Sequence, residues 1–500
     1  MSGNRMRSWI QAHSGGTYSN FIGGQWVPSS KGKTYTLYES ALPANKLGEF
    51  PDSDETDVER AVAAADEAFQ TWKDSPASVR AKILYRFAEL LEQHKEELAY
   101  MLSAEQGKVL GESFGEVQRA ANEARFCAGE ALRVDGQTLP GENAEIRTYV
   151  VRYPIGVVAA IAPWNFPVVT PVRKIAPALA YGCTVVYKPS SATPWTSVKL
   201  MELLAEAGVP GGVVNMVTGS GSKVGDPLVS HPAVKGITFT GSTGLGRRIA
   251  GIAASRLAKL QLELGGKNAA LVLDYDNLDF AAEQIVSAAF ACSGQRCTAI
   301  SRVIVLKDKA EALIAQLKEK MSRIKVGPAW AEGVTMGPLI DRRQFETVMQ
   351  YIESGKKEGA ELVLGGERLR LHQAGEEQNE GYYLSPALFA NVKKHMTIAR
   401  EEIFGPVLCV MEAEDIEEAA DIANSTDYGL AASVFTDSLQ TAQRLTSMID
   451  SGMIHINHGT ASQIHVPFGG MKKSGYGAYS IGHSNQEFFT GMKAVYIKSG

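Results

Sequence analysis

Cysteine is scarce in this 500-residue sequence, and no two cysteines stand in Cys-x-x-Cys spacing. The five are Cys127, Cys183, Cys292, Cys297 and Cys409. Such an odd, scattered set excludes the paired framework of small secreted domains and predicts free thiols in a reducing compartment. No apolar run reaches the roughly 18 residues of a membrane-spanning helix, and the first ten residues lack the apolar core of a secretory signal. We therefore expect a cytoplasmic protein without a membrane partner.

The sequence also lacks an excess of positive charge. Its formal net charge is -5 at pH 7 and it has no polybasic cluster, which argues against nucleic acid as a partner. What is present is the composition of an ordinary globular protein, with 45% hydrophobic residues and 49 glycines. A chain of this length exceeds one hydrophobic core, so we expect two or three structural units.

Alternation of strands and helices dominates the middle of the chain. Before it, apolar spacing predicts a helix over residues 57–72 and a second helix that opens at Ser75-Pro76 and ends near Gly107. From Gly156 onwards we expect strands at residues 157–162, 183–187, 213–217, 236–239 and 259–263. Helices are expected between them, near residues 170–180, 195–207, 222–229 and 243–256. This alternation predicts a parallel sheet with helices on both faces.

A second alternating series follows. Its expected strands are residues 269–273, 301–306, 407–412, 431–435 and 453–457. Its expected helices lie near residues 279–290, 309–323, 340–357, 415–424 and 438–449. The predicted fold class is therefore α/β, with two parallel-sheet units that meet near Gly265-Gly266. Residues 364–380 are rich in Gly, Arg and Glu and are expected to form a solvated surface excursion.

Two further β-prone segments fit neither series. They are Arg147 to Tyr153 and Val495 to Lys498. Edge strands of this kind seek a partner, which would make them contacts in an oligomer. The alternative is that they cap the chain's own sheets, and the pattern alone does not separate the two.

A thiol and a carboxylate suggest covalent carbonyl chemistry. Cys297 ends the turn Gly294-Gln-Arg-Cys297, and Glu263 stands on an apolar strand about thirty positions upstream. A thiol nucleophile and a base are the two groups that such chemistry needs. The alternatives are an inert buried thiol, as we expect for Cys292, and a structural ion pair between Glu263 and Lys267.

Two turns suggest a nucleotide-binding site. The small residues between Phe239 and Gly246 connect a strand to a helix, where a backbone can approach a pyrophosphate, although the spacing is not Gly-x-Gly-x-x-Gly. Lys188, Ser190 and Ser191 follow another strand and could contact a ribose. A carboxylate usually binds the ribose 2′-hydroxyl there, so its absence leaves room for a 2′-phosphate. Turns and solvated lysines without any ligand are the alternative.

Eight motifs together resemble the aldehyde dehydrogenase superfamily, in its non-phosphorylating, semialdehyde-dehydrogenase-like form, over nearly the whole chain. In family order they are Pro163-Trp-Asn-Phe-Pro167, Lys188-Pro-Ser, Phe239-Thr-Gly-Ser-Thr, Leu262-Glu-Leu-Gly-Gly-Lys267, Gly294-Gln-Arg-Cys297, Glu401-Glu-Ile-Phe-Gly-Pro406, Asn457 and Pro467-Phe-Gly-Gly470. The resemblance implies a Rossmann-like dinucleotide-binding domain of residues 1–135 and 155–266 and a catalytic thiol domain of residues 267–481. It also implies a small β oligomerisation element of residues 136–154 and 482–500, and hence a homodimer or homotetramer.

The implied reaction is oxidation of an aldehyde to its carboxylic acid with reduction of NAD or NADP. Cys297 would attack the aldehyde, while Asn165 and the Cys297 amide would hold the oxyanion. Glu263 would then activate water to hydrolyse the thioester, and apolar neighbours suit the raised pKa that such a base needs. Transfer of the acyl group to coenzyme A is one alternative, and a non-catalytic binding protein on the same scaffold is another.

The resemblance also implies a cofactor site. Glu402 would bind the nicotinamide ribose and Phe404 would pack near the nicotinamide. The other implied cofactor contacts are Ala162, Pro163, Trp164, Lys188, Ser190, Ser191, Gly221, Gly241, Ser242 and Leu264. Family members restricted to NAD usually have glutamate at the position of Ser191, so NADP or dual use is expected.

The resemblance also implies substrate contacts, and the sequence departs from the family pattern near its C-terminal end. Arg296 suits an aldehyde with a second carboxylate, or else a salt bridge within the protein, and Phe468 is the other implied substrate contact. No metal is expected, because His455, His458 and His465 lack zinc spacing and more plausibly follow the substrate tunnel. Tyr479 replaces a glutamate that is credited with proton relay in relatives, and Ala478 replaces the adjacent arginine.

Overall fold

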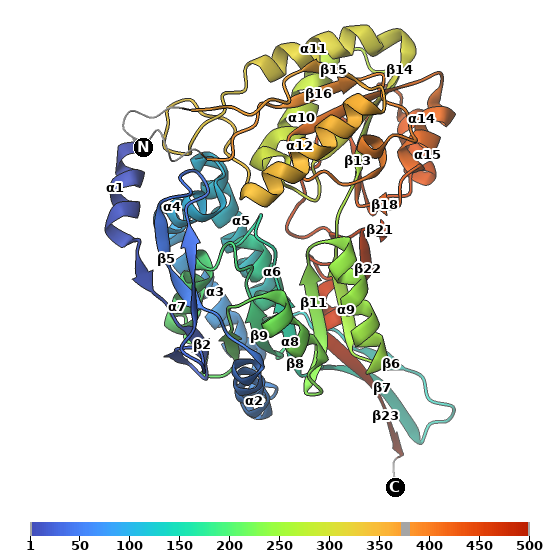
Figure 1. Cartoon of the computed structure of the whole chain (residues 1–500). Coiled ribbons are helices and arrows are strands. Elements are labelled where there is room, and N and C mark those ends of the chain that lie inside the picture. Colours follow the sequence, from blue (N-terminus) through green and yellow to red (C-terminus); the bar gives the residue numbers. More distant parts are fainter. Residues whose placement is uncertain (1–2, 372–380, 499–500) are drawn as a thin grey trace.

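Two α/β units make up most of the structure, a computed structural model that describes residues 3–371 and 381–498 (Figure 1). One unit contains an eight-stranded sheet and the other a seven-stranded sheet. In Figure 1 the second unit, yellow to orange, lies above the first, which is mostly blue to green. The predicted α/β fold class with two parallel-sheet units is confirmed.

The eight-stranded sheet has the order β22-β12-β11-β8-β9-β10-β2-β3. Its parallel centre consists of β12 (Lys259–Glu263), β11 (Val234–Thr240), β8 (Val157–Ile161), β9 (Thr184–Lys188) and β10 (Val214–Met216). Antiparallel edges are added by β22 (Gly475–Gly477), β2 (Asn20–Ile22) and β3 (Gln25–Val27). Every residue of β8 and β9 is buried, as expected for strands covered on both faces.

Helices cover both faces of this sheet. Val158 and Ala160 of β8 pack toward one group of helices, and Val157 and Ala159 toward another. The first group contains α3 (Ala77–Gln93), α4 (Lys95–Gln106), α5 (Leu110–Glu130), α6 (Val169–Ala180) and α7 (Trp195–Glu206). The second group contains α2 (Glu55–Trp72), α8 (Asp226–Ser230) and α9 (Thr243–Ser255).

The single helix predicted from Ser75-Pro76 to Gly107 is two helices in the structure. The chain leaves helical geometry at His94, between α3 and α4, and Pro76 caps α3 instead of occupying its first turn. Gly107 does end α4, in the left-handed conformation with φ of 93°. The helix predicted near residues 222–229 opens with a π-helical turn, Gly221–Gly225, before α8.

The seven-stranded sheet has the order β15-β16-β17-β14-β13-β19-β20 and is parallel except for β15. The strands are β13 (Asn268–Val272), β14 (Ile300–Leu306), β15 (Glu361–Leu364), β16 (Ala387–Ala390), β17 (Val407–Ala413), β19 (Ala431–Phe435) and β20 (Met453–Ile456). All five predicted strands are present, but β15 and β16 were not predicted. Part of the predicted surface excursion, residues 372–380, lies outside the described residues.

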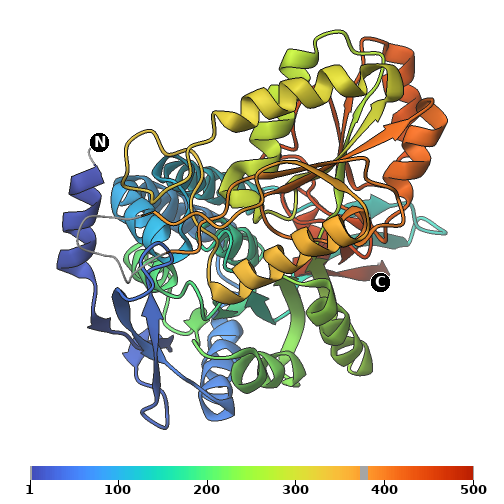
Figure 2. The same ribbon diagram turned by 45° about the horizontal axis from the view of Figure 1, so that its top comes forward.

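Helices again lie on two faces, as Figure 2 shows. One face carries α10 (Leu278–Phe290) and α11 (Ala310–Ser322). The other carries α12 (Arg342–Lys357), α13 (Thr397–Arg400), α14 (Ile416–Asn424) and α15 (Leu439–Met448). The predicted boundary at Gly265-Gly266 lies between β12 of one sheet and β13 of the other. The chain returns to the first sheet through β22, so the two units share the C-terminal segment.

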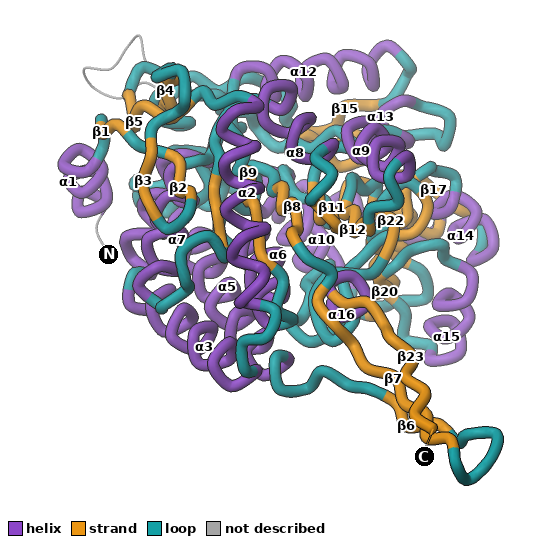
Figure 3. The backbone as a smooth tube through the Cα atoms, turned by 90° about the horizontal axis from the view of Figure 1, so that it is seen from below, coloured by secondary structure: helices purple, strands orange, loops and turns teal. Residues whose placement is uncertain are grey.

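A three-stranded antiparallel arm projects from the molecule (Figure 3). It consists of β6 (Gln137–Leu139), β7 (Ile146–Pro154) and β23 (Thr490–Lys498), with β7 in the middle. The two predicted edge segments are therefore strands that pair with each other, Tyr149 opposite Val495, and they cap neither large sheet. The exposed apolar side chains of the arm include Tyr149, Val151, Tyr153, Met492, Tyr496 and Ile497. The role of this arm in an oligomer stays a prediction.

Smaller elements complete the fold. They are α1 (Gly3–His13), β1 (Gly16–Thr17), β4 (Thr34–Tyr38), β5 (Lys46–Pro51), β18 (Tyr428–Gly429), β21 (Met471–Lys472) and α16 (Asn485–Phe489). Strands β1, β5 and β4 form a separate three-stranded sheet, and β18 pairs with β21. Within residues 3–371 and 381–498, none of the helices combines the length and apolarity needed to cross a bilayer.

Candidate active site

A cavity of about 520 Å³ brings the predicted thiol, base and amide together. Cys297, Glu263 and Asn165 all line it. The other predicted residues in its lining are Pro163, Trp164, Gly241, Ser242, Leu264, Arg296, Glu402, Phe404 and Phe468. Several of these follow the carboxyl ends of β8, β11 and β12, the edge at which open parallel sheets bind ligands. Ala162, Lys188, Ser190, Ser191 and Gly221 lie outside this lining.

Cys297 is carried by a tight turn after α10. Cys292 and Ser293 have left-handed backbones, with φ of 54° and 56°. Gly266 is required beside the nucleophile, because a Cβ there would lie 2.4 Å from the Cys297 carbonyl oxygen. That oxygen accepts a hydrogen bond of 2.7 Å from Asn268 Nδ2. Backbone contacts thus fix the turn on both sides of the sulfur.

The Cys297 thiol is protonated at neutral pH. Burial raises its pKa to about 12, and the carboxylates of Glu402 and Glu263 add to the shift. Thiolate, and not thiol, is the nucleophilic form of cysteine. A nucleophilic role for Cys297 would therefore need a group in the site that accepts the thiol proton.

Glu263, at the end of β12, is a carboxylate suited to that role. Its Oε1 accepts hydrogen bonds from Ser480, from Oγ at 3.0 Å and from N–H at 3.4 Å. Its Oε2 is buried and has no hydrogen-bond partner within the described part of the chain. Burial raises the pKa of Glu263 to about 7, although Ser480, Lys174 and Arg173 oppose the shift. A carboxyl group of this kind accepts and releases protons near neutrality.

The ion pair between Glu263 and Lys267, the alternative reading of the sequence, does not form. Lys267 Nζ is buried without a hydrogen-bond partner among the residues described, and burial lowers its pKa to about 8. The cations that act on Glu263 are Lys174 and Arg173 of α6. Lys174 Nζ donates to Thr238 Oγ1 at 3.1 Å. The base is consequently left without a neutralising salt bridge.

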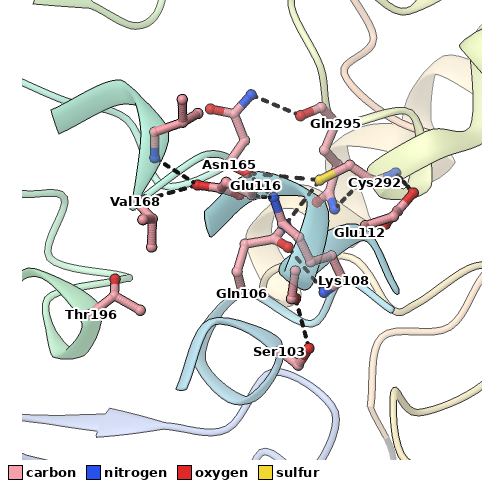
Figure 4. A network of polar contacts seen from close by, with 12 residues as sticks. Ser103, Gln106, Lys108, Glu112, Glu116, Asn165, Val168, Thr196, Cys292 and Gln295 are labelled. Carbon is pink, nitrogen blue, oxygen red and sulfur yellow. Dashed lines mark hydrogen bonds and ion pairs between the residues drawn. The ribbon is translucent and has the colours of Figure 1, made fainter. Parts of the chain in front are cut away.

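Asn165 lies on the loop between β8 and α6, in the network of Figure 4. Its Nδ2 donates one hydrogen bond, of 2.9 Å, to the Gln295 carbonyl oxygen two residues before the thiol. An amide nitrogen has two hydrogens, so a second N–H remains for a ligand in the cavity. The amide is thereby anchored to the turn that carries the nucleophile.

A buried ion pair supports the Asn165 loop. Lys108 Nζ contacts Glu116 Oε2 at 2.6 Å and donates to the Asn165 carbonyl oxygen at 2.8 Å (Figure 4). The other Glu116 oxygen accepts the N–H groups of Val168 and Val169 at 2.8 and 3.1 Å. Lys108 and Glu116 were not among the predicted site residues. The signal that could have indicated them is a series of charged residues four positions apart, at 108, 112 and 116, of which Lys108 and Glu116 are buried.

Cys292 is buried as expected, but its surroundings are polar. Gln106 Nε2 lies 3.4 Å from its sulfur, and its N–H donates to Glu112 Oε1 at 2.8 Å. Burial raises its pKa to about 11. Cys292 therefore belongs to the network that holds the turn, and is more than a small apolar residue.

Glu402 and Phe404 approach the cavity from the loop before β17. Glu402 Oε1 accepts the Gly266 N–H at 2.9 Å, and burial raises its pKa to about 7. A Cβ on Gly265 would lie 2.2 Å from Glu402 Oε2, so this approach requires glycine. Phe404 has a φ of 55° and meets the Trp164 ring edge-on, with 5.3 Å between centroids. The two contacting rings form an aromatic wall at this end of the cavity.

The start of α9 is open to a phosphate group. Ser242 is its N-cap residue and makes no side-chain cap, and Gly241 and Ser242 both line the cavity. Gly246 allows α9 to pack closely, since a Cβ there would lie 2.3 Å from Leu264 Cδ2. N–H groups and the helix dipole favour an anion at such an end.

The residues predicted to bind a ribose lie at the end of β9 and just after it, and β9 is the neighbour of β8 at the same edge of the sheet. Ile161 of β8 is in register with Lys188 of β9, and the Ala162 N–H donates to the Lys188 carbonyl oxygen at 3.3 Å. Burial lowers the pKa of Lys188 to about 8. Ser191 Oγ donates to the Gly219 carbonyl oxygen at 2.8 Å, just before the π-helical turn that opens at Gly221. Together with α9, this edge can accommodate a dinucleotide, which fits the predicted cofactor.

Three guanidinium groups share the cavity with Cys297. Arg119 and Arg173 both pair with Glu123, at 2.9 and 2.8 Å, and Arg173 also stacks on Phe468 at 5.1 Å. Arg296 contacts only Thr298 Oγ1, at 3.3 Å, and its buried Nε has no partner among the described residues. The internal salt bridge suggested for Arg296 is absent from the described ion pairs. This part of the cavity therefore favours an anionic ligand.

The histidines noted in the sequence lie outside the cavity lining, although Ala461 and Ser462 of the same loop belong to it. His455 and His458 rings meet edge-on at 4.8 Å, and burial lowers the pKa of His455 to about 4. Within the described chain, no group of three or more His, Cys, Asp or Glu side chains is arranged to hold a metal ion.

Comparison with known proteins places these features in a family. A model of the aldehyde dehydrogenase family matches residues 26–495. The α-ketoglutaric semialdehyde dehydrogenase of Bacillus subtilis is 43% identical, over 96% of this chain and 98% of its own. The 2,5-dioxopentanoate dehydrogenase of Saccharolobus solfataricus is 40% identical, over 94% and 98%. Among solved structures, an NADP-dependent enzyme of E. coli aligns with a TM-score of 0.93 at 35% identity, covering 98% of this chain and 99% of that one.

Proposed function

This chain belongs to the aldehyde dehydrogenase family, and we propose that it oxidises an acidic semialdehyde to the dicarboxylic acid by way of a thioester on Cys297. The reaction class, oxidation of an aldehyde to its acid with NAD or NADP, follows from the family. The observation that carries the proposal is the single cavity that holds Cys297, Glu263 and three arginines. The identity of the substrate and the roles of the residues are our proposals.

In the first half of the reaction, Cys297 Sγ attacks the aldehyde carbon. Glu263 Oε2 is the free acceptor in the cavity that can take the thiol proton. The second N–H of Asn165 and the Cys297 amide stabilise the oxyanion, and losing one such donor typically costs about 3–4 kcal/mol of transition-state stabilisation. When bound, the nicotinamide accepts the hydride that leaves the carbon and so permits the thioester to form.

Glu263 then releases the thiol proton to solvent, and in the second half water attacks the thioester. Glu263 Oε2 accepts the proton of the water, the C–S bond breaks, and the proton returns to the Cys297 sulfur. The free Oε2 supports hydrolysis over transfer to coenzyme A, since a thiol acceptor would need no water-activating base. The combination of thiol, base and amide in one cavity likewise supports an enzyme over a non-catalytic binding protein.

For the cofactor we propose NADP in preference to NAD. Phe404, with Trp164 packed edge-on against it, would lie near the nicotinamide, Glu402 would bind its ribose, and the start of α9 would meet the pyrophosphate. Lys188 and Ser191 would bind the adenosine ribose. The support for a 2′-phosphate is the hydroxyl of Ser191 in place of a carboxylate, which removes the repulsion that a glutamate would impose.

For the substrate we propose an aldehyde with a carboxylate at its far end. The buried Nε of Arg296 has no hydrogen-bond partner among the described residues, and a guanidinium binds carboxylate through paired, charge-assisted hydrogen bonds. Arg119 and Arg173 add two positive charges against the one negative charge of Glu123. Both relatives described above are named for the semialdehyde of a dicarboxylic acid.

A substrate panel with each cofactor tests this proposal. We expect 2,5-dioxopentanoate to give a kcat/KM at least tenfold higher than pentanal, a neutral aldehyde of equal length, and NADP to be preferred. Equal values for the acidic and neutral aldehydes would contradict the substrate class. Product that forms only after addition of coenzyme A would contradict hydrolysis.

We also propose a homodimer or homotetramer in the cytoplasm. The support for assembly is the arm of β6, β7 and β23, which carries exposed tyrosines and aliphatic side chains and has β6 and β23 as its edge strands. The support for a reducing compartment is that all five cysteines are free.

A further inference from the structure

Tyr479, where the sequence departs from the family pattern, and Ser480 both follow β22. The Tyr479 ring occupies the space beside two glycines: a Cβ on Gly469 would lie 2.4 Å from its Cδ1, and one on Gly452 would lie 2.8 Å from its hydroxyl. Among the described hydrogen bonds, none joins the Tyr479 hydroxyl to Glu263; the group that reaches the carboxylate is the next residue. Ser480 is therefore the side chain after β22 that contacts Glu263.

Ser480 engages one oxygen of Glu263 and leaves the other free. Its Oγ lies 3.0 Å from Oε1, and its N–H approaches the same oxygen at 3.4 Å. Both residues are buried, with 3% and 4% of their surfaces exposed. Oε2 has no partner within the described residues, and Glu263 lines the cavity that contains Cys297. The contact thus determines which carboxylate oxygen remains available.

Ser480 is itself held rigidly by Phe468. Its N–H donates to the Phe468 carbonyl oxygen at 2.8 Å, and its own carbonyl oxygen accepts the Phe468 N–H at 2.7 Å. The Ser480 hydroxyl also lies 3.2 Å from the Phe468 carbonyl oxygen. A hydroxyl has one proton and two acceptor lone pairs, so it can serve either neighbour.

This arrangement suits both protonation states of the base. When Glu263 is ionised, the hydroxyl proton of Ser480 points to Oε1. When Glu263 carries a proton on Oε2, Oε1 still accepts a hydrogen bond from the Ser480 hydroxyl, because the neutral carboxyl group keeps a carbonyl-type oxygen there. The carboxyl group keeps a hydrogen-bond partner throughout the catalytic cycle.

We propose that Ser480 is a positioning residue for the hydrolytic step: it holds Oε1 of Glu263 so that Oε2 faces the water that attacks the thioester on Cys297. This inference rests on the proposed function. In the step itself, a water proton moves to Oε2, the C–O bond forms as the C–S bond breaks, and the proton then passes to the sulfur. Ser480 gains and loses no proton overall.

The charges around Glu263 determine the sign of the expected pH effect. Lys174 and Arg173 face it from α6, Cys297 from the turn after α10, and Tyr479 from the segment after β22. Ser480 favours the ionised carboxylate, so its removal raises the pKa of Glu263. More of the base is then protonated at neutral pH, and hydrolysis slows.

The test is Ser480→Ala in the full-length enzyme, with NADP and the best aldehyde of the panel. Ser484→Ala is the matched control, because the Ser484 hydroxyl donates to the carbonyl oxygens of Tyr479 and Ile481 and not to Glu263. For Ser480→Ala we expect NADPH formation in the first turnover within twofold of wild type at pH 9, where Glu263 is ionised in both enzymes. Steady-state kcat at pH 7 should fall about tenfold, in the range of one charge-assisted hydrogen bond. The acid limb of the kcat profile should move to higher pH, and Ser480→Thr should restore both.

Should the alanine variant fold poorly, Ser480→Cys keeps the packing with a much weaker donor and should show the same shift of the acid limb. An unshifted limb with wild-type kcat would overturn the proposal. Equal losses in the first turnover and in steady state would also overturn it, because they indicate a purely structural role. Failure of the proposed function is distinguishable: wild type would reduce no cofactor, or Glu263→Gln would hydrolyse the thioester at the wild-type rate.

Discussion

Lys108 Nζ lies 2.8 Å from the Asn165 carbonyl oxygen and 2.6 Å from Glu116 Oε2, with both charged side chains fully buried. This ammonium therefore connects the start of α5 to the loop that carries the proposed oxyanion donor. The geometry implies that the position of the Asn165 amide depends on a charge pair that touches no substrate.

Replacement of Lys108 tests that dependence. Lys108→Met leaves Glu116 buried and unpaired, and removing one partner of a buried pair costs about 3–5 kcal/mol. We expect a lower urea midpoint and a kcat that falls more than the affinity for cofactor. Lys95→Met is the control, since Lys95 Nζ donates to the neutral Gln118 Oε1 in a half-buried contact outside the cavity lining. Wild-type unfolding and kcat in Lys108→Met would contradict this account.

The pH profile should report Glu263. Its pKa is raised by burial to about 7, and the base must be ionised to activate water. The rate of thioester hydrolysis should therefore fall as the pH is lowered through about 7, well above the range in which an exposed glutamate titrates, near 4.3. Glu263→Gln should abolish this limb together with most of the hydrolysis. A rate that stays constant down to pH 5 would rule out Glu263 as the base.

Arg296 should govern the preference for acidic aldehydes. In Arg296→Ala the ratio of kcat/KM between 2,5-dioxopentanoate and pentanal should fall about tenfold or more, as expected for one charge-assisted contact. Arg296→Lys should recover part of the ratio by restoring the charge. Arg343→Ala, at an exposed position of α12, provides the control. An unchanged ratio in Arg296→Ala would assign recognition to other residues.

Ser191 should govern the choice of cofactor. Ser191→Glu introduces a carboxylate beside the proposed 2′-phosphate position, so the Kd for NADP should rise at least tenfold while that for NAD stays equal or falls. Quenching of intrinsic fluorescence measures both constants without turnover. Ser191→Ala should retain most of the NADP preference, because it adds no charge. If Ser191→Glu binds NADP as wild type does, the 2′-phosphate lies elsewhere.

Much of the fold could be predicted because its signals are local. The buried strands β8, β9 and β13 are short apolar runs between turn residues, and parallel sheets covered on both faces require such runs. Strands β15 and β16 were missed because they lie beside a polar segment that suggested a loop. The break at His94 was missed because apolar spacing continues through α3 and α4, and only the backbone turn separates them.

The site residues could be predicted from the sequence only where they stand in family motifs. Cys297, Glu263 and Asn165 stand in family motifs, and the structure brings them into one cavity. Ser480 stands 217 positions from Glu263, and its contact depends on the return of the chain through β22. No local pattern marks a partner that distant. Lys108 likewise meets Asn165 only through the packing of α5 against α6.

The account depends most directly on the thioester, and mass spectrometry of the acid-quenched enzyme tests it. Wild-type enzyme, quenched during turnover of 2,5-dioxopentanoate with NADP, should show the peptide that contains Cys297 increased by the mass of the acyl group. Cys297→Ser should show no such adduct and should lose nearly all NADPH formation. An acyl group found only on another residue, or full activity in Cys297→Ser, would contradict it.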